Sequence, residues 1–188
     1  MRVVKKLLRL IAVVCWLAAA FYANQNIQES QQAGKVSRMI YQELVATAQP
    51  AMTSESSSMG VISVDGQQYI GYLQIPALKM NLPIGAEFSY EQLKQTPTRF
   101  QGSYYDKDMI VCAHNYLSHF AELESLRPGD EIKFKNVSGQ VFRYQVTNIE
   151  ILAPDQLADL VKKGDWDLTL FTCTFDTLNR VVIRAAQI

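Results

Sequence analysis

From about Val61 onward, the chain is a succession of short apolar runs, each ended by a proline, a glycine or a cluster of polar turn residues. Such runs are typical of β-strands, and their density leaves room only for short helices. About seven or eight strands in the last ~128 residues predict an all-β fold, a closed barrel or a sandwich. The expected strands are 69–75, 80–84, 109–113, 131–135, 141–152, 167–174 and 180–187.

Short helices and turns are expected between these strands. Ser89 can cap a helix over 89–96, with Gln92 three residues further on. A second helix of one or two turns is expected over 154–163, and residues 119–126 should be helical or turn-like. Pro83 cannot donate to a strand ladder, so the strand over 80–84 is expected to be edge-like.

The N-terminus has the pattern of a membrane-targeting segment. Four basic residues are found among the first nine, and the stretch Leu10 to Ala23 carries no charge. With residues 7–9 the run reaches about 17 residues, the lower limit for a helix that spans a bilayer. The basic flank predicts a cytoplasmic N-terminus and an exported remainder. A cleaved signal peptide ending near Ala18-Ala19-Ala20 is the alternative to a retained anchor, and either one exports the rest of the chain.

The sequence predicts three segments. Residues 1–24 are the basic start and the transmembrane or signal-anchor segment, 25–60 a stalk and flexible linker, and 61–188 the β-barrel. Apolar residues near helical spacing make a short stalk helix plausible, and the serine-rich stretch 53–60 is typical of a flexible spacer. We expect this stalk to be a solvated tether without a further role. The positions near helical spacing are Val36, Met39, Ile40, Leu44 and Val45.

Charge and cysteine usage restrict the function. The 18 Lys and Arg residues balance 18 Asp and Glu residues, and no basic stripe indicates nucleic-acid binding. The three cysteines, Cys15, Cys112 and Cys173, are too few for a disulfide framework in an exported domain. An unpaired thiol in an oxidising compartment needs an explanation, and catalysis is one.

Three reactive side chains lie at the ends of predicted strands. Cys173 ends one apolar strand, His114 follows another, and Arg180 opens the last one. A short hairpin can bring Cys173 and Arg180 to the same end of the sheet. A thiol nucleophile, an imidazole that moves protons and a guanidinium that stabilises an oxyanion are the components of covalent acyl transfer.

Each of these residue types also has an ordinary structural interpretation. A free cysteine is most often a small buried hydrophobe, and we favour this reading for Cys112 over a regulatory disulfide with Cys173. His119 lies in a probable turn, where we expect a surface residue. Arg184 is on the same strand face as Arg180 but about 13 Å further along, so we expect it to form a surface ion pair.

Several motifs together resemble the sortase family. The run 169–173, Thr-Leu-Phe-Thr-Cys, looks like the family's TLxTC signature, and the run 180–184 resembles its arginine-bearing last strand. The segment 113–115, Ala-His-Asn, is similar to its histidine segment. Ile75-Pro76 with 82–84 resembles its opening strands. The order and spacing agree over about residues 69–188.

The resemblance implies a closed eight-stranded sortase-like β-barrel with a few short helices, preceded by a membrane helix and stalk. It implies that Cys173 attacks the carbonyl after the threonine of an LPxTG-like sorting motif in a secreted protein. His114 would be the acid and base, and Arg180 the stabiliser of the oxyanion. Thr172 and Asn115 would contact the substrate. An amine from a peptidoglycan precursor or a pilin lysine would then resolve the thioacyl intermediate, with no cofactor required.

The subclass stays open between a class B-like sortase and another LPxTG-type class. The family's calcium-dependent members use acidic residues near the groove, but a solvated surface is the favoured reading of those present here, Asp106, Asp108, Glu122 and Glu124. Two other functions also remain open. One is an exported thiol hydrolase that uses water as the acceptor, and the other is a membrane-tethered β-barrel binding module without enzymatic activity.

Overall fold

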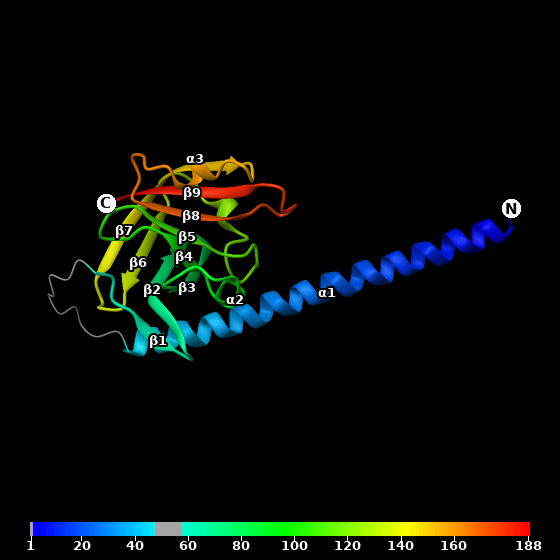
Figure 1. The fold of residues 1–188 in the computed structure, drawn as a ribbon, viewed down its shortest axis with the longest axis horizontal. Helices are drawn as coiled ribbons and strands as arrows, with labels where there is room; N and C mark the ends of the chain where they lie inside the picture. The colour runs from blue at the N-terminus through cyan, green and yellow to red at the C-terminus, as the bar shows by residue number, and fades with distance from the viewer. Residues whose placement is uncertain (1, 48–57) are drawn as a thin grey trace.

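In the computed structural model, which describes residues 2–47 and 58–188, a curled β-sheet lies against the C-terminal half of a long N-terminal helix (Figure 1). The elements are α1 Arg2–Thr47, β1 Ile62–Val64, β2 Gln67–Ile75, η1 Pro76–Leu78, β3 Met80–Gly85, α2 Tyr90–Leu93, β4 Thr98–Gln101, β5 Met109–Cys112, η2 Leu123–Ser125, β6 Glu131–Asn136, β7 Val141–Leu152, α3 Leu157–Val161, β8 Leu168–Cys173 and β9 Arg180–Gln187.

The sheet closes into a barrel. Its strands follow the order β2-β3-β4-β5-β8-β9-β7-β6, and β6 pairs back onto β2. Gly71 lies at this closure, where a Cβ atom would come 2.1 Å from the backbone oxygen of Lys135, so no larger residue fits without a shift of the strands. The described residues therefore form the closed eight-stranded barrel that the sequence predicts. β1 is an additional strand that pairs only with the first residues of β2.

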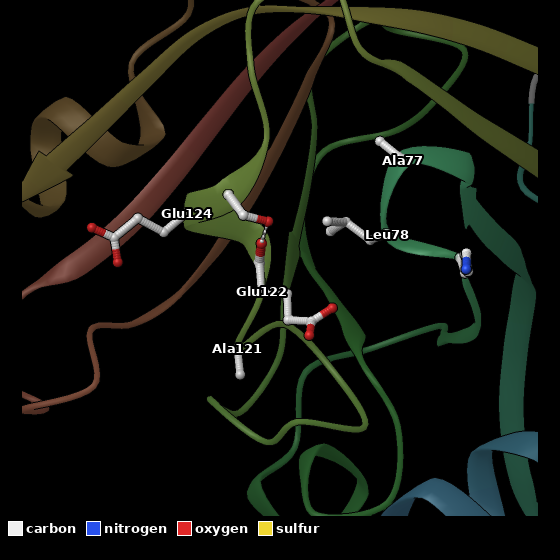
Figure 2. A pocket seen from close by; sticks show the side chains of 7 residues that line it. Ala77, Leu78, Ala121, Glu122 and Glu124 are labelled. Atoms are coloured by element: carbon white, nitrogen blue, oxygen red, sulfur yellow. Dashed lines mark hydrogen bonds between the residues drawn. The ribbon is translucent and has the colours of Figure 1, made fainter.

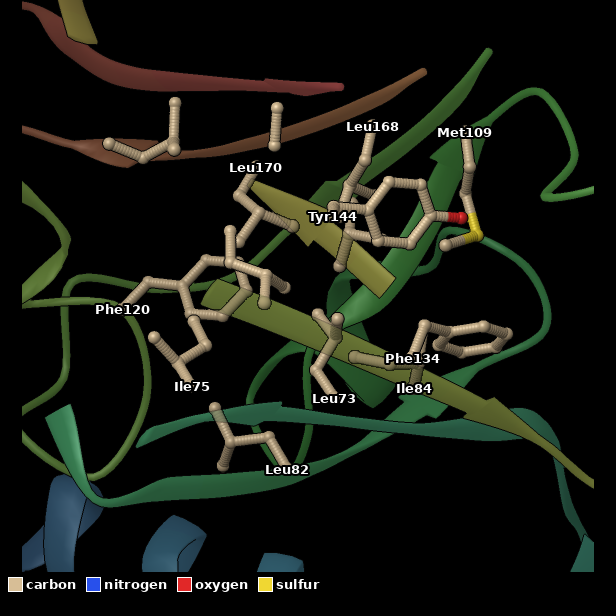
Figure 3. Close-up of a cluster of buried hydrophobic side chains, with 14 of the residues drawn as sticks. Leu73, Ile75, Leu82, Ile84, Met109, Phe120, Phe134, Tyr144, Leu168 and Leu170 are labelled. Atoms are coloured by element: carbon tan, nitrogen blue, oxygen red, sulfur yellow. The ribbon is translucent and has the colours of Figure 1, made fainter. Parts of the chain in front are cut away.

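The barrel interior is filled by alternate residues of the strands (Figure 3). Leu168 and Leu170 of β8 point inward, as side chains two apart on a strand must. Rings from other elements fill the middle, among them Phe120, Phe134 and Tyr144. Burial of this apolar surface is the main force that holds the strands together.

The first half of α1 presents apolar side chains to the surroundings. By length and composition, α1 is the one described helix that could cross a membrane. The second half packs on the barrel and is not the solvated tether that we expected from the sequence. Ala33, Ser37, Ile40 and Leu44 recur every three or four residues and are buried, because this spacing puts them on one face of the helix. Met39 and Val45, expected on the same face, are exposed.

Most of the predicted elements are found. Ser89 caps α2 by accepting a hydrogen bond from the backbone N–H of Gln92. β3 pairs with β4 at a single residue pair, which agrees with its edge-like sequence. The strands β1 and β4 were not predicted, since they are only three and four residues long. The expected spacer over 53–60 lies mostly outside the described residues.

Candidate active site

Cys173 and Arg180 face each other across a hairpin. Cys173 is the last residue of β8, Arg180 is the first of β9, and the antiparallel register pairs them directly. Residues paired in this way have Cβ atoms about 5 Å apart. Cys173 is exposed, whereas Arg180 is half-buried and donates a hydrogen bond from Nη1 to the backbone oxygen of Ala153 at 3.4 Å.

The loop between these two residues is closed by its own hydrogen bonds. The backbone N–H of Thr174 donates to the oxygen of Asn179 at 2.8 Å, and the N–H of Asn179 donates to Thr174 Oγ1 at 3.0 Å. Asp176 Oδ1 accepts hydrogen bonds from Thr174 Oγ1 and from the N–H of Leu178. The loop therefore fixes the relative position of the thiol and the guanidinium.

His114 approaches from the other side of β8. β5 runs parallel to β8, with Cys112 paired to Phe171. The contact continues beyond β5, because the N–H of Ala113 donates to the oxygen of Phe171 at 3.2 Å. Thr172 Oγ1 donates to the oxygen of Ala113 at 2.9 Å. Continuing this register places His114 opposite Cys173, at the ~4.8 Å spacing of neighbouring strands.

The thiol strand thus lies between the strand that leads to the imidazole and the strand that begins with the guanidinium. The three residues that the sequence selected, Cys173, His114 and Arg180, come together at one end of the barrel. Burial lowers the pKa of His114, and the nearby Lys94 ammonium lowers it further, while Glu29 opposes both. His114 is therefore mainly neutral at neutral pH and able to accept a proton from a thiol.

The comparisons with known proteins agree with this arrangement. The sequence pattern of the sortase domain matches residues 73–188, more than half of the chain. The chain belongs to the sortase family.

One curated relative and two solved structures define the extent of the likeness. Sortase A of Bacillus anthracis is 26% identical over 121 residues, which are 59% of this chain and 55% of that protein. The chain thus spans about half the length of this relative. A lid mutant of Streptococcus agalactiae sortase C1 has 26% identity and a TM-score of 0.58, covering 85% of this chain and 89% of that chain. Clostridium perfringens sortase C with the C-terminal cell wall sorting motif has 19% identity and a TM-score of 0.57, covering 90% and 96%. At this identity the second likeness shows the fold alone.

Arg184 does not lie at the surface, where we expected it. Arg184 forms the expected ion pair, with Glu150, but Arg184 is buried, so the expected surface position is wrong. Its Nε donates to Glu150 Oε1 at 2.7 Å, and its guanidinium lies 4.5 Å from the ring centroid of Trp166. It also donates to Thr169 Oγ1 and to the backbone oxygens of Asp159 and Leu160, which anchors α3 to the outside of β8. The two arginines of β9 therefore have different environments.

His119 is likewise buried, and the surface reading from the sequence is wrong. Its Nε2 lies 3.0 Å from Ser37 Oγ on α1. Burial lowers the pKa of His119 to about 4. The sequence could not show this, because the partner is 82 residues away in the chain.

The remaining cysteine and the predicted substrate contacts have defined surroundings. Cys112 is buried, 3.5 Å from Thr98 Oγ1, and burial raises the pKa of its thiol to about 11. This agrees with the interpretation of Cys112 as a small buried residue. Thr172 is buried with its hydroxyl on Ala113, and Asn115 is half-buried in the bend after β5. Their contact with a substrate stays a prediction.

The acidic residues that could have formed a calcium site are spread over separate places. Glu122 and Glu124 line a surface pocket with Ala77 and Leu78, and their carboxylates point in different directions (Figure 2). Asp108 Oδ1 instead accepts a hydrogen bond from the N–H of Ser103. In the described part of the chain, no three His, Cys, Asp or Glu residues are grouped so that they could hold a metal ion.

Two residues near the site have no counterpart in the sequence prediction. Tyr116 stacks on His114 with ring centroids 5.0 Å apart, and its hydroxyl donates to Glu29 Oε2 at 3.3 Å. Glu29 belongs to α1, which we expected to be a tether. The only signal in the sequence was the position of Tyr116 between two histidines.

Proposed function

We propose that this sortase-family protein is a cysteine transpeptidase that cleaves an LPxTG-like C-terminal sorting motif in secreted proteins. It transfers the acyl fragment to an amine of a peptidoglycan precursor or of a pilin lysine. The observation that carries the proposal is the position of Cys173 between the strand leading to His114 and the strand that begins with Arg180. No other described cysteine is exposed and flanked by these two groups.

The chemistry follows from these three side chains. Neutral His114 accepts the proton of the Cys173 thiol, and the sulfur attacks the carbonyl carbon of the motif's threonine. Arg180 stabilises the resulting oxyanion by its fixed charge. When the C–N bond breaks, the leaving nitrogen takes the proton from His114, and a thioester remains on Cys173. The acceptor amine then gives a proton to His114, attacks the thioester and releases the cysteine.

A row of aromatic rings beside the thiol offers an apolar surface to the peptide. Phe171 lies on the same face of β8 as Cys173, two residues before it. Its ring meets Phe100 edge-on at 5.4 Å, and Phe100 in turn meets Phe88 at 5.6 Å. Phe88 is partly exposed. We propose that the apolar residues of the sorting motif lie along this row.

The proposed location is the cell membrane. Residues 1–24 would be the cytoplasmic start and the single membrane span, and the barrel of residues 61–188 would be extracellular. The basic residues before Leu10 and the exposed apolar surface of the first half of α1 support this topology.

The first prediction concerns the nucleophile. Full-length protein in detergent is incubated with a fluorescence-quenched LPxTG peptide, with and without an amine acceptor, and the products are identified by mass spectrometry. Cys173→Ala should abolish turnover and the thioester adduct, because it removes the attacking sulfur. Cys15→Ala, which removes the exposed thiol of α1, is the matched control and should keep wild-type turnover.

The outcomes separate the alternatives. Wild-type turnover in Cys173→Ala would contradict the proposed mechanism. A free acid as the only product, unchanged by the amine, would identify a thiol hydrolase, and binding of the peptide without cleavage a binding module. Parallel reactions with a lysine side-chain amine and with a cross-bridge-type amine distinguish a pilin acceptor from a cell wall acceptor.

A further inference from the structure

The segment from His114 to His119 is fastened to α1 at three points. Tyr116 Oη donates to Glu29 Oε2 at 3.3 Å, and Ser118 Oγ donates to the backbone oxygen of Ser30 at 2.7 Å. His119 Nε2 bonds Ser37 Oγ at 3.0 Å. These contacts join the residues after the candidate general base to a helix about 80 to 90 positions earlier in the chain.

The sequence of α1 permits this close approach. Ser30, Gly34 and Ser37 are spaced by four and three residues, so they lie on one face of the helix. A Cβ atom on Gly34 would lie 2.8 Å from Ser118 Cβ, closer than side chains tolerate. The face that meets the loop is therefore built from small residues, and a larger one at position 34 would separate the two elements.

Tyr116 contacts both histidines and the helix. Its ring is 5.0 Å from the His114 ring, tilted by 35°, and 5.6 Å from the His119 ring, tilted by 43°. The buried His119 is held by Ser37, so the Tyr116 ring contacts a fixed neighbour. The hydroxyl on Glu29 fixes the remaining rotation. Held by these two contacts, the ring can then set the orientation of His114.

The charge on α1 also acts on the imidazole. Glu29 raises the pKa of His114, whereas burial and Lys94 of the segment after α2 lower it. The helix thus supplies a negative charge on the side where Tyr116 is anchored. An imidazole that must carry a proton during the reaction gains from such a charge.

We propose that α1 contributes to the active site: Glu29 of α1 holds Tyr116, and together they position the His114 imidazole for proton transfer. This inference rests on the proposed function of His114 and adds to it the dependence on the stalk helix. Tyr116 is a positioning residue, since it acts through His114 and not on the substrate.

The experiment uses the full-length protein in detergent and four conservative variants. Tyr116→Leu removes the stacked ring, and Tyr116→Phe removes only the hydroxyl on Glu29. Glu29→Gln removes the charge. The matched control is Tyr41→Phe, which also removes a tyrosine hydroxyl at the contact between α1 and the barrel, where it accepts from Gln74 Nε2 at 3.3 Å far from His114. Turnover of the quenched peptide is measured over a range of peptide concentrations up to saturation, which gives kcat and KM separately. The pKa of the His114 imidazole is measured by NMR titration.

Tyr116→Leu should lower kcat about ten-fold or more with KM nearly unchanged, because a misplaced base affects the chemical step and not peptide binding. Tyr116→Phe should have a smaller effect in the same direction. Glu29→Gln should lower the pKa of His114, and Tyr41→Phe should change neither kcat nor the titration. Wild-type kcat together with a wild-type His114 titration in Tyr116→Leu and Glu29→Gln would overturn the inference.

The two proposals can fail separately. The NMR titration reports the coupling of Glu29 and Tyr116 to His114 in any folded sample, whether or not the protein turns over the peptide. A wild-type protein that never forms an acyl adduct on Cys173 would refute the proposed function, while a shifted His114 titration in Glu29→Gln would still support the contact with α1.

Discussion

At the scale of single residues, β9 carries two arginines whose surroundings assign them opposite roles. Arg180 is half-buried beside Cys173, with one hydrogen bond to a backbone oxygen at 3.4 Å. Arg184 is buried and donates four hydrogen bonds, to Glu150, Thr169 and two backbone oxygens. The Arg180 guanidinium can therefore still bind a substrate, whereas the Arg184 guanidinium is occupied by internal hydrogen bonds that stabilise the fold.

Replacement of each arginine by alanine should therefore give different phenotypes. Arg184→Ala should lower the free energy of unfolding by about 3 kcal/mol or more, because it leaves a carboxylate and buried acceptors without their partner. Arg180→Ala should leave unfolding almost unchanged and abolish peptide turnover. Urea unfolding followed by circular dichroism, together with the peptide assay, measures both.

Arg143→Ala is the control for the loss of an arginine as such. Its exposed pair with Glu131 is 2.7 Å long, and such pairs contribute about 0.2–1 kcal/mol. Equal destabilisation by the Arg180 and Arg184 variants would show that the two environments do not differ as the contacts indicate.

At the scale of elements, the strands were predictable because their apolar runs are local in sequence. The ends of 167–174 and 180–187 predicted Cys173 and Arg180 at one end of a hairpin, and the resemblance to the sortase family added His114, which follows 109–113. The role of α1 near His114 was not predictable, since the part of its contact face that meets the loop after His114 uses small residues, Ser30, Gly34 and Ser37. Burial of His119 and Arg184 also depends on partners far away in the chain, which no local pattern reveals.

The contact between α1 and the barrel includes a histidine that cannot easily be charged. Ser37 Oγ donates its single hydrogen to the oxygen of Gln95 at 2.7 Å, so it must accept from His119 Nε2–H. His119 Nδ1 is then the unprotonated nitrogen, and it is buried without a partner among the described residues. Protonation would place a charged N–H in this apolar position, which is why burial lowers the pKa of His119 to about 4.

The stability of the protein should consequently fall as the pH is lowered from about 6.5 to about 4. In this range the unfolded chain binds a proton at His119 and the folded chain does not, so each step down in pH favours unfolding. The full contribution is present above the unfolded pKa, and about 3 kcal/mol is lost by pH 4. Urea unfolding at a series of pH values measures the slope.

Two variants test whether His119 causes this dependence of the unfolding free energy on pH. His119→Phe should remove most of it, whereas His114→Gln should remove less, because His114 is only half-buried and its lowered pKa acts in the same direction. The other groups that act on His119 are the Gln95 carbonyl, the Tyr116 ring and the His114 imidazole, whose positive charge lowers the pKa of His119 further. The carbonyl does not titrate, the tyrosine does not titrate in this range, and the His114→Gln variant removes the imidazole. A slope unchanged in His119→Phe would contradict the assignment.

At the scale of the whole molecule, one continuous helix joins the proposed membrane span to the candidate active site. The uncharged run ends at Ala23, and the first contact with the loop after His114 is made by Glu29. Six residues of helix measure about 9 Å. Figure 1 shows the loop between β8 and β9 on the side of the barrel from which α1 leaves toward the N-terminus. The catalytic end should therefore face the bilayer at close range.

The tip of the loop between β8 and β9 carries large apolar side chains that are exposed, although their contact with water is unfavourable. Phe175 is 96% exposed and Leu178 is 66% exposed, both between Cys173 and Arg180. With the proposed topology these side chains reach the headgroup region, where aromatic rings are favoured. In this arrangement the proposed substrate, if it is held at the membrane, would meet the thiol at the membrane surface.

Tryptophan fluorescence in full-length protein, reconstituted in nanodiscs, tests this placement. In a background in which both natural tryptophans are replaced, Trp16→Phe and Trp166→Phe, Phe175→Trp should be quenched by lipids with a headgroup spin label. Val141→Trp, at the opposite end of β7 from the residue paired with Arg180, should not be quenched. Insertion of seven helix-forming residues after Asn24 lifts the barrel by about 10 Å and should abolish the quenching at position 175.

The insertion should leave cleavage of a soluble peptide intact while slowing the processing of a membrane-held substrate. Equal quenching at positions 141 and 175 would mean that the catalytic end does not face the membrane.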